Sequence, residues 1–395
     1  MLNHPELNNE QKIILLTASQ ILTDEHLIIL KSLLGNNPDW HFIASFSEAH
    51  GTAPLLYKAL NKNYFAQFVP ADIFNHLKNI YFQTQAKNLL ALYELKNVLL
   101  AFNKAGIDTI LLKGMASAEF IYKDAGLRPM GDIDFMVEPH KILDAEKIFF
   151  DLGFINTVPY KSFKLRTLNI NTHLNAFVKN HIAFELHRDL SAIHHIYRIP
   201  LNIIWENITK TSIDNVPIYV LNTDLNIMYL SLHSVQHMLK KKIRLNSFTD
   251  ISELIKQEKE NIDWEKIIHK SKQFNISIPV YKSLDLCKEF LNTPVPLYVT
   301  EKLKKENISL EQEFLLMLNN QTEKIKFKAP SDYIKKIVKI EGLTNKLKYM
   351  WTELFPSKDY IIYHYNLKNK KIFVFYYFIQ FYRQAIKSFK NIFHL

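Results

Sequence analysis

Two carboxylates placed two residues apart are the side chains of this sequence best suited to chemistry. Asp132 and Asp134 stand in the apolar run Asp132-Ile-Asp-Phe-Met-Val137. Successive side chains of a strand point to opposite faces, so both carboxylates would share one face and could jointly hold Mg²⁺. Ile133 and Phe135 would then face the core. The pair predicts a metal-dependent phosphoryl-transfer site.

The residues ahead of this pair could contact a phosphate. A short strand over 107–113 would run into Gly114, where the missing side chain lets the backbone approach a phosphate at the start of a helix over 114–122. Lys113 or Arg128 would supply positive charge. Two plainer interpretations stay open: Lys113 ends its strand in solvent, and Arg128 pairs with a carboxylate to hold its loop.

A third carboxylate, Glu185, lies in the alternating strand His181-Ile-Ala-Phe-Glu-Leu-His187. Two metal ions that clamp a nucleoside triphosphate need several oxygen ligands, and Glu185 could complete the set and accept a proton from an attacking hydroxyl. His187 shares the face of Glu185. It would contact substrate or be held by a structural hydrogen bond, and His173 gives a weaker signal of the same kind.

A histidine pair offers a second metal hypothesis. His233 and His237 are four residues apart on a predicted helix, a spacing that can bind zinc. No Glu follows His233 as in a metalloprotease pair, and no cysteine lies nearby. We therefore interpret both histidines as structural or as lining the substrate site.

The elements that must position these residues form four predicted regions of an α+β protein. Regions with helical periodicity lie on both sides of a region in which strands and helices alternate. Such alternation is typical of an α/β core. The regions are an N-terminal helical region (1–105), the core (106–222), a helical domain (223–330) and a basic aromatic C-terminal helical tail (331–395).

Local signals predict where several helices begin and end. Asp39 would cap one helix, and another would run from near Pro70 to Lys104 with Gly106 after its end. Pro139 would open a helix that stops at Gly153. Thr223 would cap the first helix of the helical domain.

Composition and charge narrow the classes of protein and of partner. The N-terminus lacks the pattern of a signal peptide, Cys287 is the only cysteine, and the longest apolar run of the tail is too short to span a bilayer. We therefore expect a cytoplasmic protein without a transmembrane segment. The net charge of +10 resides in residues 321–395, which hold fifteen Lys/Arg against five Asp/Glu.

The tail combines this charge with an aromatic stripe. Apolar residues recur there at helical spacing: Phe375, Phe378, Tyr382, Ile386, Phe389 and Phe393. We favour a helix docked on the protein's own core. The alternative is a surface for an anionic partner, either membrane or RNA.

At its motifs the sequence resembles the uncharacterised nucleotidyltransferases of the DNA polymerase β-like superfamily. The matching residues are Lys113-Gly114, Arg128-Pro-Met-Gly-Asp132-Ile-Asp134, Leu152-Gly-Phe154 and Glu185-Leu-His187. The resemblance extends to helices before the core and to residues 233–250 and 355–360 beyond it. One departure is Met115, which follows Gly114 where the superfamily usually has Gly or Ser.

The resemblance implies a polymerase β-like α/β core with a small mixed sheet, flanked by helical regions. It also implies that Asp132, Asp134 and Glu185 bind Mg²⁺ or Mn²⁺. The residues expected to contact the NTP are Lys113, Gly114, Arg128 and His187.

The expected function is Mg²⁺-dependent transfer of a nucleoside monophosphate from an NTP to an acceptor hydroxyl, with release of pyrophosphate. The acceptor stays open among a small molecule, a protein and RNA. One alternative is a glycosyltransferase, because such enzymes also use Asp-x-Asp with a metal. The other is a non-catalytic nucleotidyltransferase-like module that binds nucleic acid or membrane through its basic tail.

Overall fold

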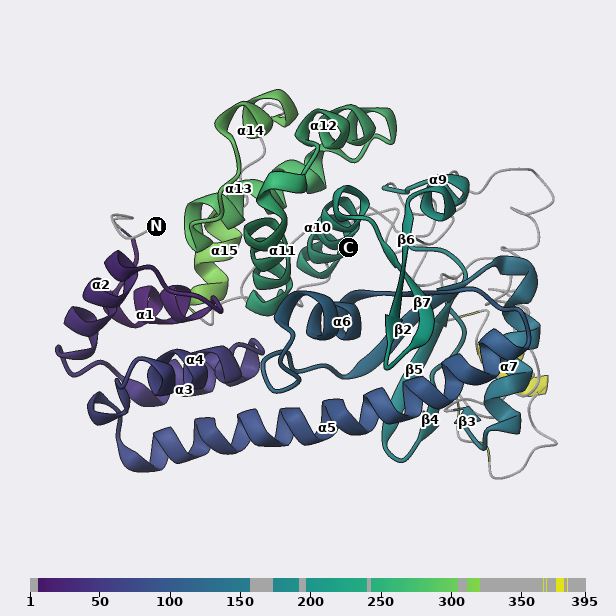
Figure 1. Ribbon diagram of the computed structural model, residues 1–395, viewed down its shortest axis with the longest axis horizontal. Coiled ribbons are helices and arrows are strands. Elements are labelled where there is room, and N and C mark those ends of the chain that lie inside the picture. The colour runs from purple at the N-terminus through teal and green to yellow at the C-terminus, as the bar shows by residue number, and fades with distance from the viewer. Residues whose placement is uncertain are drawn as a thin grey trace. The chain divides into compact units, whose positions relative to one another are not determined.

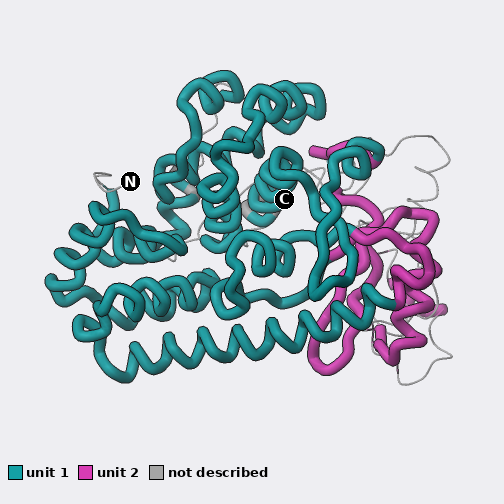
Figure 2. Tube along the Cα trace, viewed as in Figure 1, with its two compact units in different colours: residues 1–100, 110–134, 202–325 teal, residues 101–109, 135–201, 326–395 magenta. Residues whose placement is uncertain are grey.

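The computed structural model describes residues 6–156, 173–191, 197–239, 243–304 and 311–319, with 365, 367, 374–379 and 382 (Figure 1). The chain divides into two compact units (Figure 2). Unit 1 holds residues 1–100, 110–134 and 202–325, and unit 2 holds 101–109, 135–201 and 326–395. The sequence-based division at 105, 222 and 330 stays a prediction.

Helices dominate the first hundred residues, as the sequence predicts. Asn8 opens the first with a capping box, because its side chain accepts from Gln11 N at 2.9 Å while Gln11 Oε1 accepts from Asn8 N at 3.0 Å. Asp39 caps as expected and accepts from Phe42 N at 3.0 Å. The elements are α1 (Asn9–Thr17), α2 (Asp24–Leu34), α3 (Trp40–Ala49), α4 (Ala53–Lys62), η1 (Ala66–Phe68) and α5 (Ala71–Lys104).

A mixed sheet of seven strands follows, in the order β3-β4-β5-β2-β1-β7-β6. β1 pairs with β7 in parallel, whereas β3–β4, β4–β5 and β6–β7 are antiparallel. The strands are β1 (Thr109–Leu111), β2 (Asp132–Val137), β3 (Ile155–Asn156), β4 (Phe177–Lys179), β5 (Ile182–His187), β6 (Ile208–Ile213) and β7 (Val216–Leu221). The predicted α+β class and mixed sheet are thereby confirmed.

Short helical elements connect these strands. They are α6 (Lys113–Ala116), the π-helical turn η2 (Ser117–Tyr122), η3 (Pro139–Lys141), α7 (Ile142–Asp151) and α9 (Leu201–Glu206). Gly153 ends α7 with a φ of 83°, as its position predicts. The predicted helix over 114–122 is thus two elements, because the π-helical turn changes the hydrogen-bond pattern after one α-helical turn.

Phe149 of α7 lies at the centre of an aromatic cluster in unit 2. Its ring centroid is 4.5 Å from that of Phe177 and within 5.7 Å of four others. These four are Phe102, Phe135, Phe154 and Phe184, and all six rings are buried. The cluster packs α7 against strand residues from β2, β4 and β5, so it forms the core that holds these strands in place.

Unit 1 continues with a helical group. The helices are α10 (Thr223–Leu239), α11 (Leu245–Glu258), η4 (Lys259–Asn261), α12 (Trp264–Gln273), α13 (Ser277–Leu291), α14 (Leu297–Leu303) and α15 (Glu311–Leu318). The prediction that Thr223 caps α10 is wrong. Thr223 is the first helical residue, and Asn222 Oδ1 accepts from Leu225 N at 3.0 Å.

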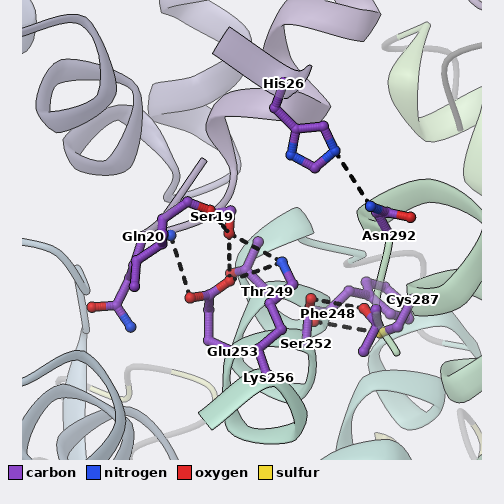
Figure 3. Close-up of polar contacts among 12 residues, drawn as sticks. Ser19, Gln20, His26, Phe248, Thr249, Ser252, Glu253, Lys256, Cys287 and Asn292 are labelled. Atoms are coloured by element: carbon purple, nitrogen blue, oxygen red, sulfur yellow. Dashed lines mark hydrogen bonds and ion pairs between the residues drawn. The ribbon is translucent and has the colours of Figure 1, made fainter. Parts of the chain in front are cut away.

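The core of this helical group contains the lone cysteine. Cys287 of α13 is fully buried, its thiol donates to the carbonyl of Phe248 at 3.5 Å, and burial raises the pKa of the thiol (Figure 3). No helix within the described ranges combines the length and the apolar character needed to cross a membrane.

The predicted tail helix lies largely outside the described residues. Residues 374–379 are helical, and Val374, Phe375, Phe378 and Tyr382 are exposed.

Candidate active site

β2 presents the carboxylate pair from the sheet. Asp132 is half-buried and Asp134 is buried. The backbone oxygen of Asp134 accepts from Leu112 N at 2.9 Å, directly after β1 ends. This bond holds the backbone of Asp134 beside Leu112, the residue that precedes α6.

Lys113, the first residue of α6, has a left-handed conformation with a φ of 46°. Such a φ is uncommon outside glycine and occurs often at functional sites. Its Nζ lies 2.6 Å from Asp134 Oδ1, and the two side chains are 16% and 6% exposed. Lys113 therefore does not simply end its strand in solvent. It places a positive charge against one of the two carboxylates of the motif.

Gly114 is buried next to the loop that precedes β2. A Cβ at Gly114 would lie 3.2 Å from the Cβ of Met130. The glycine thus allows α6 and this loop to approach closely. Whether it also admits a phosphate, as the sequence predicts, stays a prediction.

Arg128 in this loop pairs with Asp250 of α11. Nε donates to Oδ1 and Nη2 donates to Oδ2, both at 2.8 Å, and Nη1 donates to the carbonyl of Pro129. Burial alone would lower the pKa of Arg128, but the charge and hydrogen bonds of Asp250 hold it above its usual value. The sequence left two interpretations of Arg128 open. The structure shows the one in which Arg128 pairs with a carboxylate, here that of Asp250. The predicted contact with an NTP stays a prediction.

β5 carries the third carboxylate and His187, and His173 lies beside them. Glu185 is half-buried, and its Oε2 lies 3.7 Å from Nε2 of His187 and 3.8 Å from Nε2 of His173. His173 forms a β-bridge with His187 and its ring centroid is 5.0 Å away. His181, predicted to begin the strand, instead lies in the β4–β5 turn, where it and Asn180 both have positive φ.

Among the described residues, Asp134, Glu185 and His187 form a group that could hold a metal ion. Each offers one ligand atom, and these atoms lie within 4.8 Å of one another. Carboxylate oxygens suit Mg²⁺ and Mn²⁺, whereas an imidazole nitrogen suits transition metals such as Zn²⁺ and Fe²⁺. The group thus offers ligands for a divalent metal ion.

The rings of His233 and His237 on α10 are tilted against each other at 59°, with centroids 4.3 Å apart, and neither histidine is part of the group described above.

Sequence reasoning missed Asp250 and underrated His173. Asp250 stands between Phe248 and Ile251 on the apolar face of α11, where a carboxylate requires a partner. That position is the signal that could have drawn attention to it. His173 gives no comparable signal, because its neighbours in space come from β5.

Comparison with known proteins supplies the family. The model of a family described as "Uncharacterised nucleotidyltransferase" matches residues 36–292, well over half of the chain. No curated protein is similar enough to the chain to count as a match.

Proposed function

Because the chain belongs to this family of uncharacterised nucleotidyltransferases, we propose that it transfers a nucleoside monophosphate from an NTP to an acceptor hydroxyl, assisted by Mg²⁺ or Mn²⁺. The observation that carries the proposal is the family match, since it spans every proposed site residue from Lys113 to His187. The proposal includes a polymerase β-like fold for the core at 106–222.

The carboxylates would hold the metal. Asp132 and Asp134 share a strand face, and the group of Asp134, Glu185 and His187 supports a ligand set that draws on β5 as well. A bound divalent cation would neutralise charge on the triphosphate and on the leaving group. Lys113, 2.6 Å from Asp134, already provides positive charge at this point.

In the proposed reaction the acceptor oxygen attacks the α-phosphorus. The bond between that phosphorus and the oxygen bridging to the β-phosphate breaks, and pyrophosphate leaves with the electron pair. Glu185 accepts the proton of the acceptor hydroxyl. Lys113 and Arg128 would bind the phosphate oxygens, and Gly114 would let the backbone approach them.

Label transfer tests the proposal. The protein is incubated with Mg²⁺, fractions of a cell lysate and each NTP labelled with ³²P at either the α- or the γ-phosphate. We expect α-label but not γ-label on an acceptor, because the β- and γ-phosphates leave together. Transfer of the γ-label would indicate phosphoryl transfer instead.

Two double variants make the test specific to the site. Asp132→Asn/Asp134→Asn should lose the transfer. Asp144→Asn/Asp151→Asn, which changes two exposed carboxylates of α7, should keep it. Absence of label transfer and of NTP binding in the unmodified protein would refute the enzyme proposal, and NTP binding without transfer would favour a non-catalytic module.

A further inference from the structure

A buried ion pair connects α11 with the loop in front of β2. The side chains of Arg128 and Asp250 are 12% and 3% exposed. Asp250 is bidentate, with one oxygen on Nε and the other on Nη2 of Arg128, each at 2.8 Å. In this geometry the carboxylate fixes the plane of the guanidinium as well as its position.

The backbone of the same loop has a separate support. The buried side chain of Asn88 on α5 donates to the carbonyls of Ala125 at 2.8 Å and of Arg128 at 2.9 Å. Lys87 donates to the carbonyl of Met130 at 3.0 Å. The path of the loop therefore depends on α5, while the orientation of the Arg128 side chain depends on Asp250.

The guanidinium keeps donors for a ligand. It has five N–H groups, of which three are directed to Asp250 and to the carbonyl of Pro129. Within the part of the chain that the structure describes, one N–H on each terminal nitrogen is left. Arg128 precedes Asp132 by four residues, and the charge of Asp132 contributes to the raised pKa of Arg128. An oriented guanidinium thus stands close to a proposed metal ligand.

We propose that Asp250 is a positioning residue that orients Arg128 toward the triphosphate of an NTP. This inference rests on the proposed function. Asp250 itself would not touch the substrate. Its carboxylate would preset the guanidinium, so that no binding energy is spent on ordering a flexible side chain when the triphosphate arrives.

Asp250→Asn is the informative variant, because it keeps the size of the side chain and one oxygen but removes the charge and one acceptor. We expect the affinity for a non-hydrolysable NTP analogue with Mg²⁺ to fall about 10- to 100-fold, a loss like that caused when the hydrogen-bonding partner of a metal ligand is removed. The affinity for Mn²⁺ without nucleotide should not change. A purely structural role would lower both affinities or neither.

Glu253→Gln is a matched control on the same helix. Glu253 is also a buried carboxylate of α11, and it accepts from Ser19 Oγ at 2.8 Å and from Lys256 Nζ at 3.1 Å (Figure 3). Glu253→Gln therefore also removes a buried charge from α11, but at a contact with the segment that follows α1. This variant should bind the NTP analogue as the unmodified protein does.

Binding is measured by calorimetric titration with an analogue of each of the four NTPs, and Mn²⁺ binding by electron paramagnetic resonance. Equal NTP affinities for Asp250→Asn and Glu253→Gln would overturn the positioning role. If Asp250→Asn does not fold, Asp250→Glu replaces it. That variant keeps the charge but displaces the guanidinium by a methylene, so unchanged NTP affinity would overturn the role equally. An unmodified protein that binds no NTP would refute both the proposed function and this inference.

Discussion

Acidification should destabilise the protein through the buried histidine His50. This residue follows α3, is 9% exposed and stacks on Phe46 with ring centroids 4.1 Å apart. Burial, with a smaller contribution from the charge of Arg244, lowers the pKa of His50 from 6.5 to about 4. His50 is therefore neutral in the folded protein at pH values where the unfolded chain already binds a proton.

The sign of the effect follows from this difference. Because the unfolded state binds more protons between pH 6.5 and pH 4, the free energy of unfolding decreases as the pH falls through this window. With pKa values of 6.5 and about 4, the contribution of His50 that is present at pH 7 declines by about 2 kcal/mol at pH 5 and by about 3 kcal/mol at pH 4.

A non-titrating variant isolates this contribution. His50→Gln removes the protonation step, whereas the carboxylates that also titrate are common to both proteins. Urea-induced unfolding, followed by circular dichroism at pH 7, 6 and 5, gives the free energy of unfolding of each protein as a function of pH. We expect the curve of the variant to be flatter, with a difference of about 2 kcal/mol accumulated between pH 7 and pH 5. Parallel curves would show that the burial of His50 does not set its protonation, and the reasoning would be wrong.

Three further predictions concern packing and the metal. Phe149→Ala should lower the free energy of unfolding by about 3–5 kcal/mol, because it opens a cavity among five buried rings, while Phe150→Ala, at a 39% exposed ring, should cost far less in the same urea titration. Gly126→Ala should destabilise by about 1–3 kcal/mol in thermal unfolding, since its Cβ would lie 2.4 Å from Cε2 of Tyr81, and a change below about 0.5 kcal/mol would contradict that packing. Lys113→Met should lower the melting temperature in EDTA, because it removes the ammonium partner of the buried carboxylate of Asp134. Adding Mg²⁺ should then raise the melting temperature of this variant by more than that of the unmodified protein. Equal Mg²⁺ effects on both proteins would argue against a cation at Asp134.

Sequence patterns were most informative where local chemistry decides the structure. β2 spans the predicted residues 132–137, and Ile133 and Phe135 are buried as the alternating pattern predicts. Asp39 and Gly153 act at the helix ends as expected, since capping involves only neighbouring residues.

Long-range contacts and unusual local geometry were beyond such patterns. The partner of Arg128 is 122 residues away, so spacing could indicate a carboxylate partner without identifying Asp250. The π-helical turn η2 has no periodicity that distinguishes it from a short α-helix. The left-handed φ of Lys113 was likewise unexpected, because lysine has no intrinsic preference for that conformation.

The buried Cys287 has a practical consequence for experiments on this protein. It is the only cysteine of the chain, it is fully buried, and its raised pKa keeps the thiol protonated. A maleimide reagent needs an accessible thiolate, so the folded protein should give almost no labelling background. A cysteine introduced at an exposed position can then carry a single fluorophore without removal of the native one. In the unmodified protein, the rate of labelling would report how often the core around α13 opens.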